Sequence, residues 1–310
     1  MVGSRAWGLA HAGSDEDHRG VFALPFAWTQ GLVAAPEDLV SADGSATFWA
    51  AGKAIRQALR ADPNTLEMLF VPGARAVDPI GEWLLAERDA FVSTEIYGTF
   101  GRYAIGQLRR LEQGARLAEH RAVVLDWLRQ EPGLSLDRVA EKLAAAAGSA
   151  HQAKQYVKQL YRSMHDQGLL DANEFTALVR FARDHAASFD LPRELRPKNA
   201  YNLLRLIATA TGWLREGTPT FALEGPVRAR LLAIKAGEVD LADVLAEAES
   251  LAPGLEAARD ASCLPRRPDV ARADALLRRI GAELARRWAS GAPGALGADA
   301  PPPPEVVWNE

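Results

Sequence analysis

Residues 3–8 read GSRAWG and residues 14–22 read SDEDHRGVF, so a small Gly-Ser turn precedes two aspartates that are one residue apart. Side chains alternate between the two faces of a strand, which predicts that Asp15 and Asp17 point to the same side. Two such carboxylates can hold two Mg²⁺ ions for phosphoryl transfer, and the phosphates of a nucleoside triphosphate (NTP) would complete the coordination. We therefore predict Asp15 and Asp17 as catalytic and metal-binding residues.

The Gly-Ser turn has the properties of a phosphate site. Gly3 lets the backbone approach a phosphate closely, and Ser4 adds a hydroxyl donor at an expected helix N-terminus. Arg5 and Arg19 flank the motif, where each can contact triphosphate oxygens or form a salt bridge with a nearby carboxylate. Alone, a Gly-Ser pair or an Asp-x-Asp is usually an ordinary turn or loop, but their order and their spacing of about ten residues favour nucleotide binding.

A third carboxylate usually completes such a site or deprotonates the attacking hydroxyl. Glu67 is our first choice for this catalytic and metal-binding role, because it interrupts an apolar run where an unpaired carboxylate would be costly to bury. The alternative is that Glu67 is an outward-facing residue of an alternating strand. Asp43 is the second choice, since it precedes a predicted helix, but it also suits a turn in the sequence SADG at residues 41–44.

The two N-terminal motifs resemble those of the nucleotidyltransferases of the DNA polymerase β superfamily. Within it, the chain is similar to the RNA-ligase-associated (RlaP/YcgL-like) branch, with Trp7 at the usual aromatic position and with Glu16 and His18 where apolar residues are commoner. The similarity covers most of the chain apart from a gap at about residues 117–195. The other matching segments are DPNTLEMLF at 62–70, RYAIGQLRRL at 102–111, KNAYNLLRL at 198–206, IKAGE at 234–238 and LPRRPD at 264–269.

The resemblance implies an enzyme that moves a nucleoside monophosphate from an NTP to an acceptor hydroxyl, with Mg²⁺ as cofactor and pyrophosphate as the second product. The branch suggests RNA, in end-processing or repair, as the acceptor. The alternative is a non-catalytic nucleotide- or RNA-binding module that has lost turnover. In the superfamily a helix and an apolar strand precede the Gly-Ser pair, whereas here only Met1 and Val2 do; we expect a start upstream of Met1, the alternative being a truncated form.

Lys198, Tyr201 and Arg205 fall on one face of a helix predicted at residues 198–213, and the opposite face is apolar. With the resemblance, this face is a candidate nucleotide site in which Tyr201 stacks on the base and Lys198 contacts phosphate. A solvated helix surface is the alternative.

A basic stripe with helical spacing lies in the region that the resemblance does not cover. It consists of His151, Lys154, Lys158, Arg162 and His165, and an apolar face lies beside it on the same predicted helix. Such a stripe beside a catalytic cleft suits an RNA backbone, and a solvated surface is again the alternative.

Composition excludes several classes of site. The single cysteine, Cys263, excludes a disulfide framework and a Cys-based zinc site, and the six histidines lack the spacing of a zinc motif. The net charge of −4 argues against broad, non-specific binding of nucleic acid. No signal peptide or long apolar span is visible, so we expect a cytoplasmic protein without membrane association.

The predicted fold class is α+β, with a mixed nucleotidyltransferase-type sheet followed by an all-helical domain. We expect a catalytic domain at residues 1–115, a helical domain at 116–290 and a disordered, proline-rich tail at 291–310. The predicted strands lie at 15–22, with an apolar strand candidate at 21–24, and at 66–71. The predicted helices lie at about 47–59, 136–147, 149–168, 171–188, 198–213 and 240–251.

Overall fold

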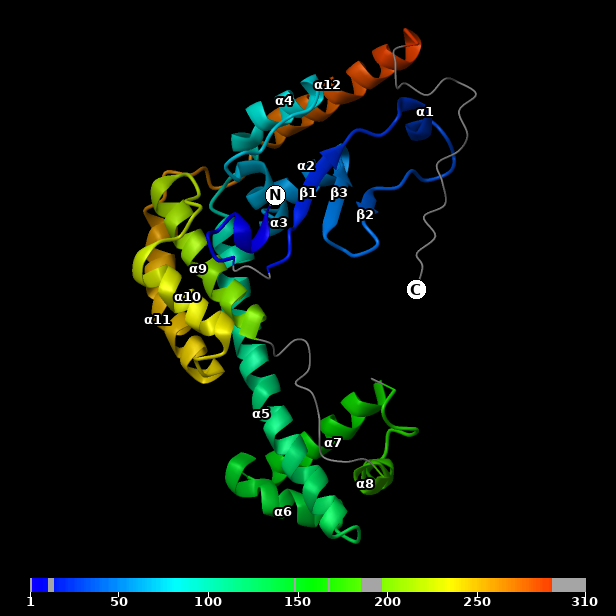
Figure 1. The fold of residues 1–310 in the computed structure, drawn as a ribbon, viewed down its shortest axis with the longest axis vertical. Helices are drawn as coiled ribbons and strands as arrows, with labels where there is room; N and C mark the ends of the chain where they lie inside the picture. The colour runs from blue at the N-terminus through cyan, green and yellow to red at the C-terminus, as the bar shows by residue number, and fades with distance from the viewer. Residues whose placement is uncertain (1, 11–13, 148, 167, 185–196, 292–310) are drawn as a thin grey trace. The chain divides into compact units, whose positions relative to one another are not determined.

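The computed structural model describes residues 2–10, 14–147, 149–166, 168–184 and 197–291 (Figure 1). The chain divides into two compact units. Unit 1 comprises Met1–Gly106, Tyr201–Glu238 and Ala246–Glu310, and unit 2 comprises Gln107–Ala200 and Val239–Leu245. Helices from the second half of the chain therefore pack with the N-terminal segment in unit 1, a grouping that differs from the predicted border at residue 115.

Unit 1 contains a small mixed sheet of three strands, β1 (His18–Phe22), β2 (Asp38–Val40) and β3 (Ala46–Ala50). The order is β1-β3-β2; β3 pairs with β1 in parallel and with β2 antiparallel. Helix α2 (Ala51–Leu59) contacts β1 and β3. The predicted α+β class with a mixed sheet is confirmed.

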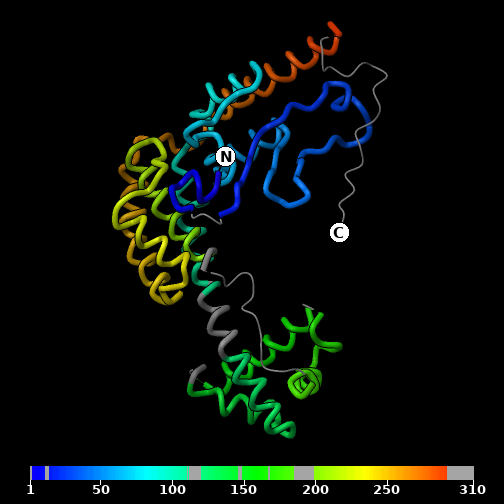
Figure 2. Tube along the Cα trace, in the orientation of Figure 1, coloured from blue at the N-terminus to red at the C-terminus, as the bar shows by residue number. Residues whose placement is uncertain are grey.

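Helices make up most of the rest of unit 1. Helix α12 (Val270–Ala289) packs against α1 (Phe26–Thr29), α2 and α4 (Pro79–Ala86). The remaining elements are η1 (Gly3–Arg5), α3 (Pro63–Phe70), η2 (Arg88–Phe91), the π-helical η3 (Tyr97–Arg102), α9 (Pro197–Glu216), α10 (Gly225–Ala236) and α11 (Leu241–Asp260). The first residues of α9 and α11, at 197–200 and 241–245, belong to unit 2. Figure 2 shows the N-terminal segment beside α9 and α10, and Trp7 and Leu9 of this segment are fully buried.

One predicted element of unit 1 is wrong, and another is wrong in its first four residues. Residues 66–70 belong to helix α3 and not to a strand, and Val71 is the C-cap of this helix. The helix forms because the Asp62 carboxylate caps it by accepting the Thr65 N–H at 2.9 Å and because Pro63 occupies the first helical turn. The predicted helix at 47–59 is strand β3 followed directly by α2. Its first residues, Thr47 to Trp49, are strand formers that pair with both β1 and β2.

Unit 2 is helical. Helix α5 (Tyr103–Gln130) begins in unit 1, and α6 (Leu136–Ala147), α7 (Ala150–Asp166) and α8 (Phe175–Asp184) follow it. Their apolar faces form one core that includes Leu128, Val139, Val157 and Leu178. The helices predicted at 136–147, 149–168 and 171–188 correspond to α6, α7 and α8. Most of the predicted tail at 291–310 lies outside the described residues.

Candidate active site

The Gly-Ser turn lies against the second aspartate. Residues Gly3–Arg5 form one turn of 3₁₀ helix rather than the start of the longer helix that we expected. Gly3 has a φ of +70°, and a Cβ at this position would collide with the Asp17 carboxylate. The Val2 N–H donates to the Asp17 carbonyl at 2.8 Å, which ties the turn to the start of β1. Gly3 is therefore required both by its backbone conformation and by the closeness of Asp17.

The two aspartates are held differently. Asp17 forms an isolated bridge with Val2 directly before β1, and its side chain is 36% exposed. Asp15 precedes the bridge, outside any strand, and is exposed. Because Asp15 lies outside the strand, the alternation of side chains along a strand does not place Asp15 and Asp17 on the same side. That both aspartates hold metal remains a prediction.

The flanking arginines both have protein partners. Arg5 Nη2 donates to the Ser14 carbonyl at 2.9 Å, and its Nε lies 3.6 Å from Glu16 Oε1. Arg19 donates from Nη1 to the carbonyls of His18 (2.8 Å) and Ser45 (3.3 Å). Arg19 Nη2 is also 4.0 Å from Asp17 Oδ1. Both arginines thus brace the loop around the aspartates, which corresponds to the salt-bridge alternative.

Glu67 is part of a buried polar cluster. Glu67 lies on α3 and is 7% exposed, and its Oε1 accepts a hydrogen bond from Arg205 Nη1 at 2.6 Å. Its Oε2 accepts from the Trp7 indole Nε1 at 3.3 Å. The Arg205 guanidinium also lies 4.5 Å from the centre of the Trp7 ring. Both carboxylate oxygens are engaged by protein donors, so this geometry suits a residue that positions Trp7 better than the predicted metal ligand or the outward-facing strand residue.

Arginine and lysine side chains of α9 and α10 hold the segment after the Gly-Ser turn. Arg228 Nε donates to the Gly8 carbonyl at 2.9 Å, and Lys235 Nζ donates to the Leu9 carbonyl at 2.8 Å. Together with Arg205 on Trp7, these contacts fix three consecutive residues of the loop. We call Arg205, Arg228 and Lys235 the cationic clamp.

Tyr201 lies inside this arrangement. It is 2% exposed, and Lys235 Nζ lies 5.5 Å from the centre of its ring. Burial raises the pKa of the Tyr201 phenol; Arg205 opposes this rise, whereas Glu67 and Asp17 add to it. The Tyr201 ring packs within the protein, so it is not exposed for the base stacking that we expected. The side chain of Lys198, the expected phosphate contact, lies outside the described residues.

Asp43, the second choice for the third carboxylate, serves a turn. Its Oδ1 accepts from the Ser41 hydroxyl at 2.6 Å and from the Ser45 hydroxyl and N–H at 2.8 and 3.1 Å. The Ser41 hydrogen bond, followed by those of Ser45, lowers the pKa of Asp43 to about 2. The turn alternative therefore describes Asp43, which closes the connection between β2 and β3.

The predicted metal site has few candidate donors among the described residues. Across the described ranges, no group of three or more His, Cys, Asp or Glu side chains is arranged to hold a metal ion. The partly open Asp17 carboxylate against a glycine that has no Cβ does fit a cation bound to a substrate phosphate. A Mg²⁺ ion here would depend on Asp15, Asp17 and phosphate oxygens.

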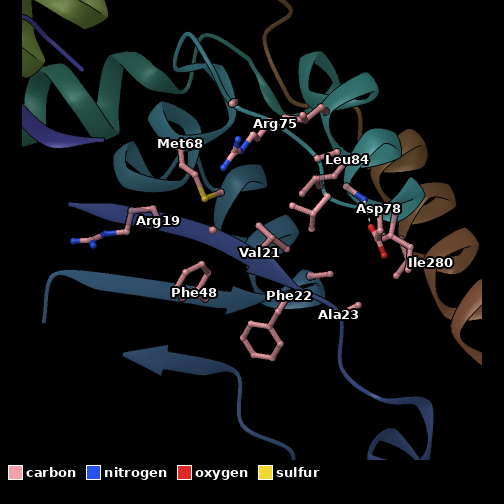
Figure 3. Close-up of a pocket in the computed structure, with 18 of the residues that line it drawn as sticks. Arg19, Val21, Phe22, Ala23, Phe48, Met68, Arg75, Asp78, Leu84 and Ile280 are labelled. Atoms are coloured by element: carbon pink, nitrogen blue, oxygen red, sulfur yellow. Dashed lines mark hydrogen bonds between the residues drawn. The ribbon is translucent and has the colours of Figure 1, made fainter. Parts of the chain in front are cut away.

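A cleft that the sequence did not predict runs along β1, with a volume of about 830 Å³. Figure 3 shows Val21 of β1 across from Met68 of α3 and Leu84 of α4, with Arg75 between them. Its only acidic lining residue among those described, Asp78, caps α4 and pairs with Arg287 at 3.2 Å. An apolar wall with cationic groups suits a ligand that has a planar or apolar body and negative charge.

A protein-family model described as RNA repair pathway DNA polymerase beta family matches residues 1–279. The chain belongs to this family. The match contains the Gly-Ser and Asp-x-Asp motifs, the cationic clamp and unit 2, so it also spans the gap in the resemblance at 117–195. No curated protein and no solved structure matches the chain. Within the described residues, none of the helices has the length and apolar character needed to cross a bilayer.

The sequence pattern does not predict the roles of Trp7, Arg228 and Lys235. A signal was present for Lys235, since the segment IKAGE that contains it is one of the family-like segments. Trp7 was noted only as a variant of an aromatic position. Arg228 carries no signal in the sequence, because its partner is a backbone carbonyl 220 residues away.

Proposed function

We propose that the protein is a Mg²⁺-dependent nucleotidyltransferase that moves a nucleoside monophosphate from an NTP to an acceptor hydroxyl. The observation that carries the proposal is the contact between Gly3 and Asp17, in which a left-handed glycine presses the Gly-Ser turn onto the carboxylate of the Asp-x-Asp motif. Membership in a polymerase β family of RNA repair supports RNA as the acceptor.

The residues of the Gly-Ser and Asp-x-Asp motifs would each have a separate role in the transfer. Asp15 and Asp17 would hold Mg²⁺, which would neutralise charge on the NTP phosphates. The backbone at Gly3 and the Ser4 hydroxyl would receive a phosphate. The acceptor hydroxyl would lose its proton to solvent, and its oxygen would bond to the α-phosphorus as the bond to pyrophosphate breaks.

Glu67 and the cationic clamp would position the loop at residues 7–9 rather than contact the substrate. They hold residues 7–9, and these residues connect the Gly-Ser turn to the Asp-x-Asp motif. The apolar cleft beside Val2 and His18 would accept the nucleoside part of a substrate, since its volume is within the range of ligand pockets.

Release of pyrophosphate tests the proposal. The full chain is incubated with each of the four NTPs, total RNA and Mg²⁺, and pyrophosphate is measured with and without chelator. We expect chelator-sensitive release that Asp17→Asn abolishes. Glu16→Gln is the matched control, because it removes one exposed carboxylate between the two aspartates. Nucleotide binding without release would contradict the enzyme proposal and would support the binding-module alternative.

A further inference from the structure

Helix α7 of unit 2 presents an unusual outer face. Lys154, Lys158 and Arg162 follow one another at intervals of four residues, and the only acidic residue in the helix is Asp166 at its end. Residues four apart are neighbours on a helix surface, so these like charges repel and destabilise the helix. The face therefore has a composition that folding alone does not favour.

Two of these cations are unpaired. Lys154 forms an ion pair with Asp137 of α6, and Asp166 lies 3.7 Å from His165. In the part of the chain that the structure describes, Lys158 and Arg162 have neither a hydrogen bond nor an ion pair with the protein. The side chains of Gln155 and Gln159, which offer both donors and acceptors, are exposed beside them.

The opposite face of α7 is buried in the core of unit 2. Ala153, Val157 and Met164 are at most 1% exposed in the core of unit 2. A helix that binds a membrane surface buries its apolar face in the lipid, and that face of α7 is not available. What remains accessible is a row of cations and amides that rises about 6 Å for every four residues.

We infer that this basic face of α7, formed by Lys158, Arg162, Gln155 and Gln159, binds the phosphate backbone of single-stranded RNA. The choice of RNA rests on the proposed function, in which RNA is the acceptor. Arginine and lysine would contact phosphates, and the glutamines would contact ribose or base edges. Unit 2 would then hold the RNA, and unit 1 would carry the transfer chemistry.

The test measures binding of the full chain to a labelled single-stranded RNA by fluorescence anisotropy, without NTP or Mg²⁺, between 50 and 200 mM salt. The variant is Lys158→Gln/Arg162→Gln, which keeps good helix formers. The control is Arg138→Gln/Arg180→Gln, which removes two exposed charges from α6 and α8 of the same unit. Circular dichroism and thermal unfolding check that both variants fold.

Each phosphate contact with a single strand contributes about 0.7 to the slope of log affinity against log salt. Loss of two contacts should therefore reduce the slope by about 1.4, so the advantage of the wild type should shrink roughly sevenfold from 50 to 200 mM. The control should keep the wild-type slope. An unchanged slope in the variant, an equal loss in the control, or tighter binding to polyglutamate than to RNA would overturn the inference.

The RNA-binding test of the α7 face can fail or succeed independently of the pyrophosphate-release test of the transferase proposal. Pyrophosphate release with a short acceptor does not need an extended RNA surface, so the α7 variant should keep it. Normal release with unchanged RNA binding refutes the basic face alone. Absence of release with a reduced salt slope refutes the transferase proposal alone.

Discussion

Replacing Arg205 with methionine should destabilise unit 1 strongly. The substitution keeps much of the side-chain volume but leaves the Glu67 carboxylate with the Trp7 indole as its remaining described donor. The side chains of Arg205 and Glu67 are 10% and 9% exposed, so solvent can compensate little. Removing one partner of such a buried pair costs about 3–5 kcal/mol. That is a large share of the roughly 5–15 kcal/mol by which a domain is stable.

Urea unfolding followed by tryptophan fluorescence measures this loss. Of the eight tryptophans only Trp127 falls in unit 2, so the signal reports mainly on unit 1. The double variant Glu67→Leu/Arg205→Met should lose less than the sum of the two single variants, because it leaves no unpaired buried charge.

The matched control is Arg278→Met, which breaks a surface pair with Asp274 at a similar distance of 2.7 Å. There the side chains are 80% and 50% exposed. We expect a change of about 0–1 kcal/mol. An Arg205→Met variant that unfolds like this control would refute the assignment of Glu67 as a buried positioning residue.

Three further outcomes are expected. Asp15→Asn and Asp17→Asn should each abolish pyrophosphate release while thermal unfolding stays close to that of the wild type, and release at the wild-type rate in either variant would rule out the metal site. Gly3→Val should weaken NTP binding in a calorimetric titration more than Ser4→Ala does, because valine is strained at a φ of +70° and meets the Asp17 carboxylate; equal affinities would make the turn purely structural. The pKa of Asp43 is lowered from 3.8 to about 2, so the stabilisation that the Asp43 carboxylate gives is present above pH 4 and is lost as the pH falls through 2. The difference in thermal midpoint between wild type and Asp43→Asn should therefore shrink over this pH window. A difference that stays constant would contradict a stabilising role of the ionised carboxylate.

The sequence predicted elements whose signals are local. The helix predicted at 136–147 is α6, and the Ser135 hydroxyl caps its start by accepting the Arg138 N–H at 3.3 Å. The mixed sheet was likewise predicted, as part of the resemblance. Caps, glycines and amphipathic periods act over a few residues, which explains why these features can be read from the chain.

The errors have a physical cause. Thr65 to Leu69 of α3 are all buried, so the helix has no polar face and its apolar run looks the same as a buried strand. The partner of Glu67 could not be predicted either, because Arg205 is 138 residues away and the pairing depends on how α9 folds back. Glu67 was correctly singled out as a carboxylate that needs a cation, but the cation is an arginine.

Because the cationic clamp comes from α9 and α10, the N-terminal motif can make its native contacts only after both helices have been synthesised. Lys235 follows its partner Leu9 by 226 residues. At about 5–20 residues per second, a nascent chain holds Asp15 and Asp17 for roughly 10–45 s before Lys235 is made. During that time Trp7 lacks Arg205 and the loop carbonyls lack their donors. The structure thus ties the proposed activity to the synthesis of at least the first 235 residues, and a product that ends earlier would contain the Gly-Ser and Asp-x-Asp motifs without the side chains that hold residues 7–9.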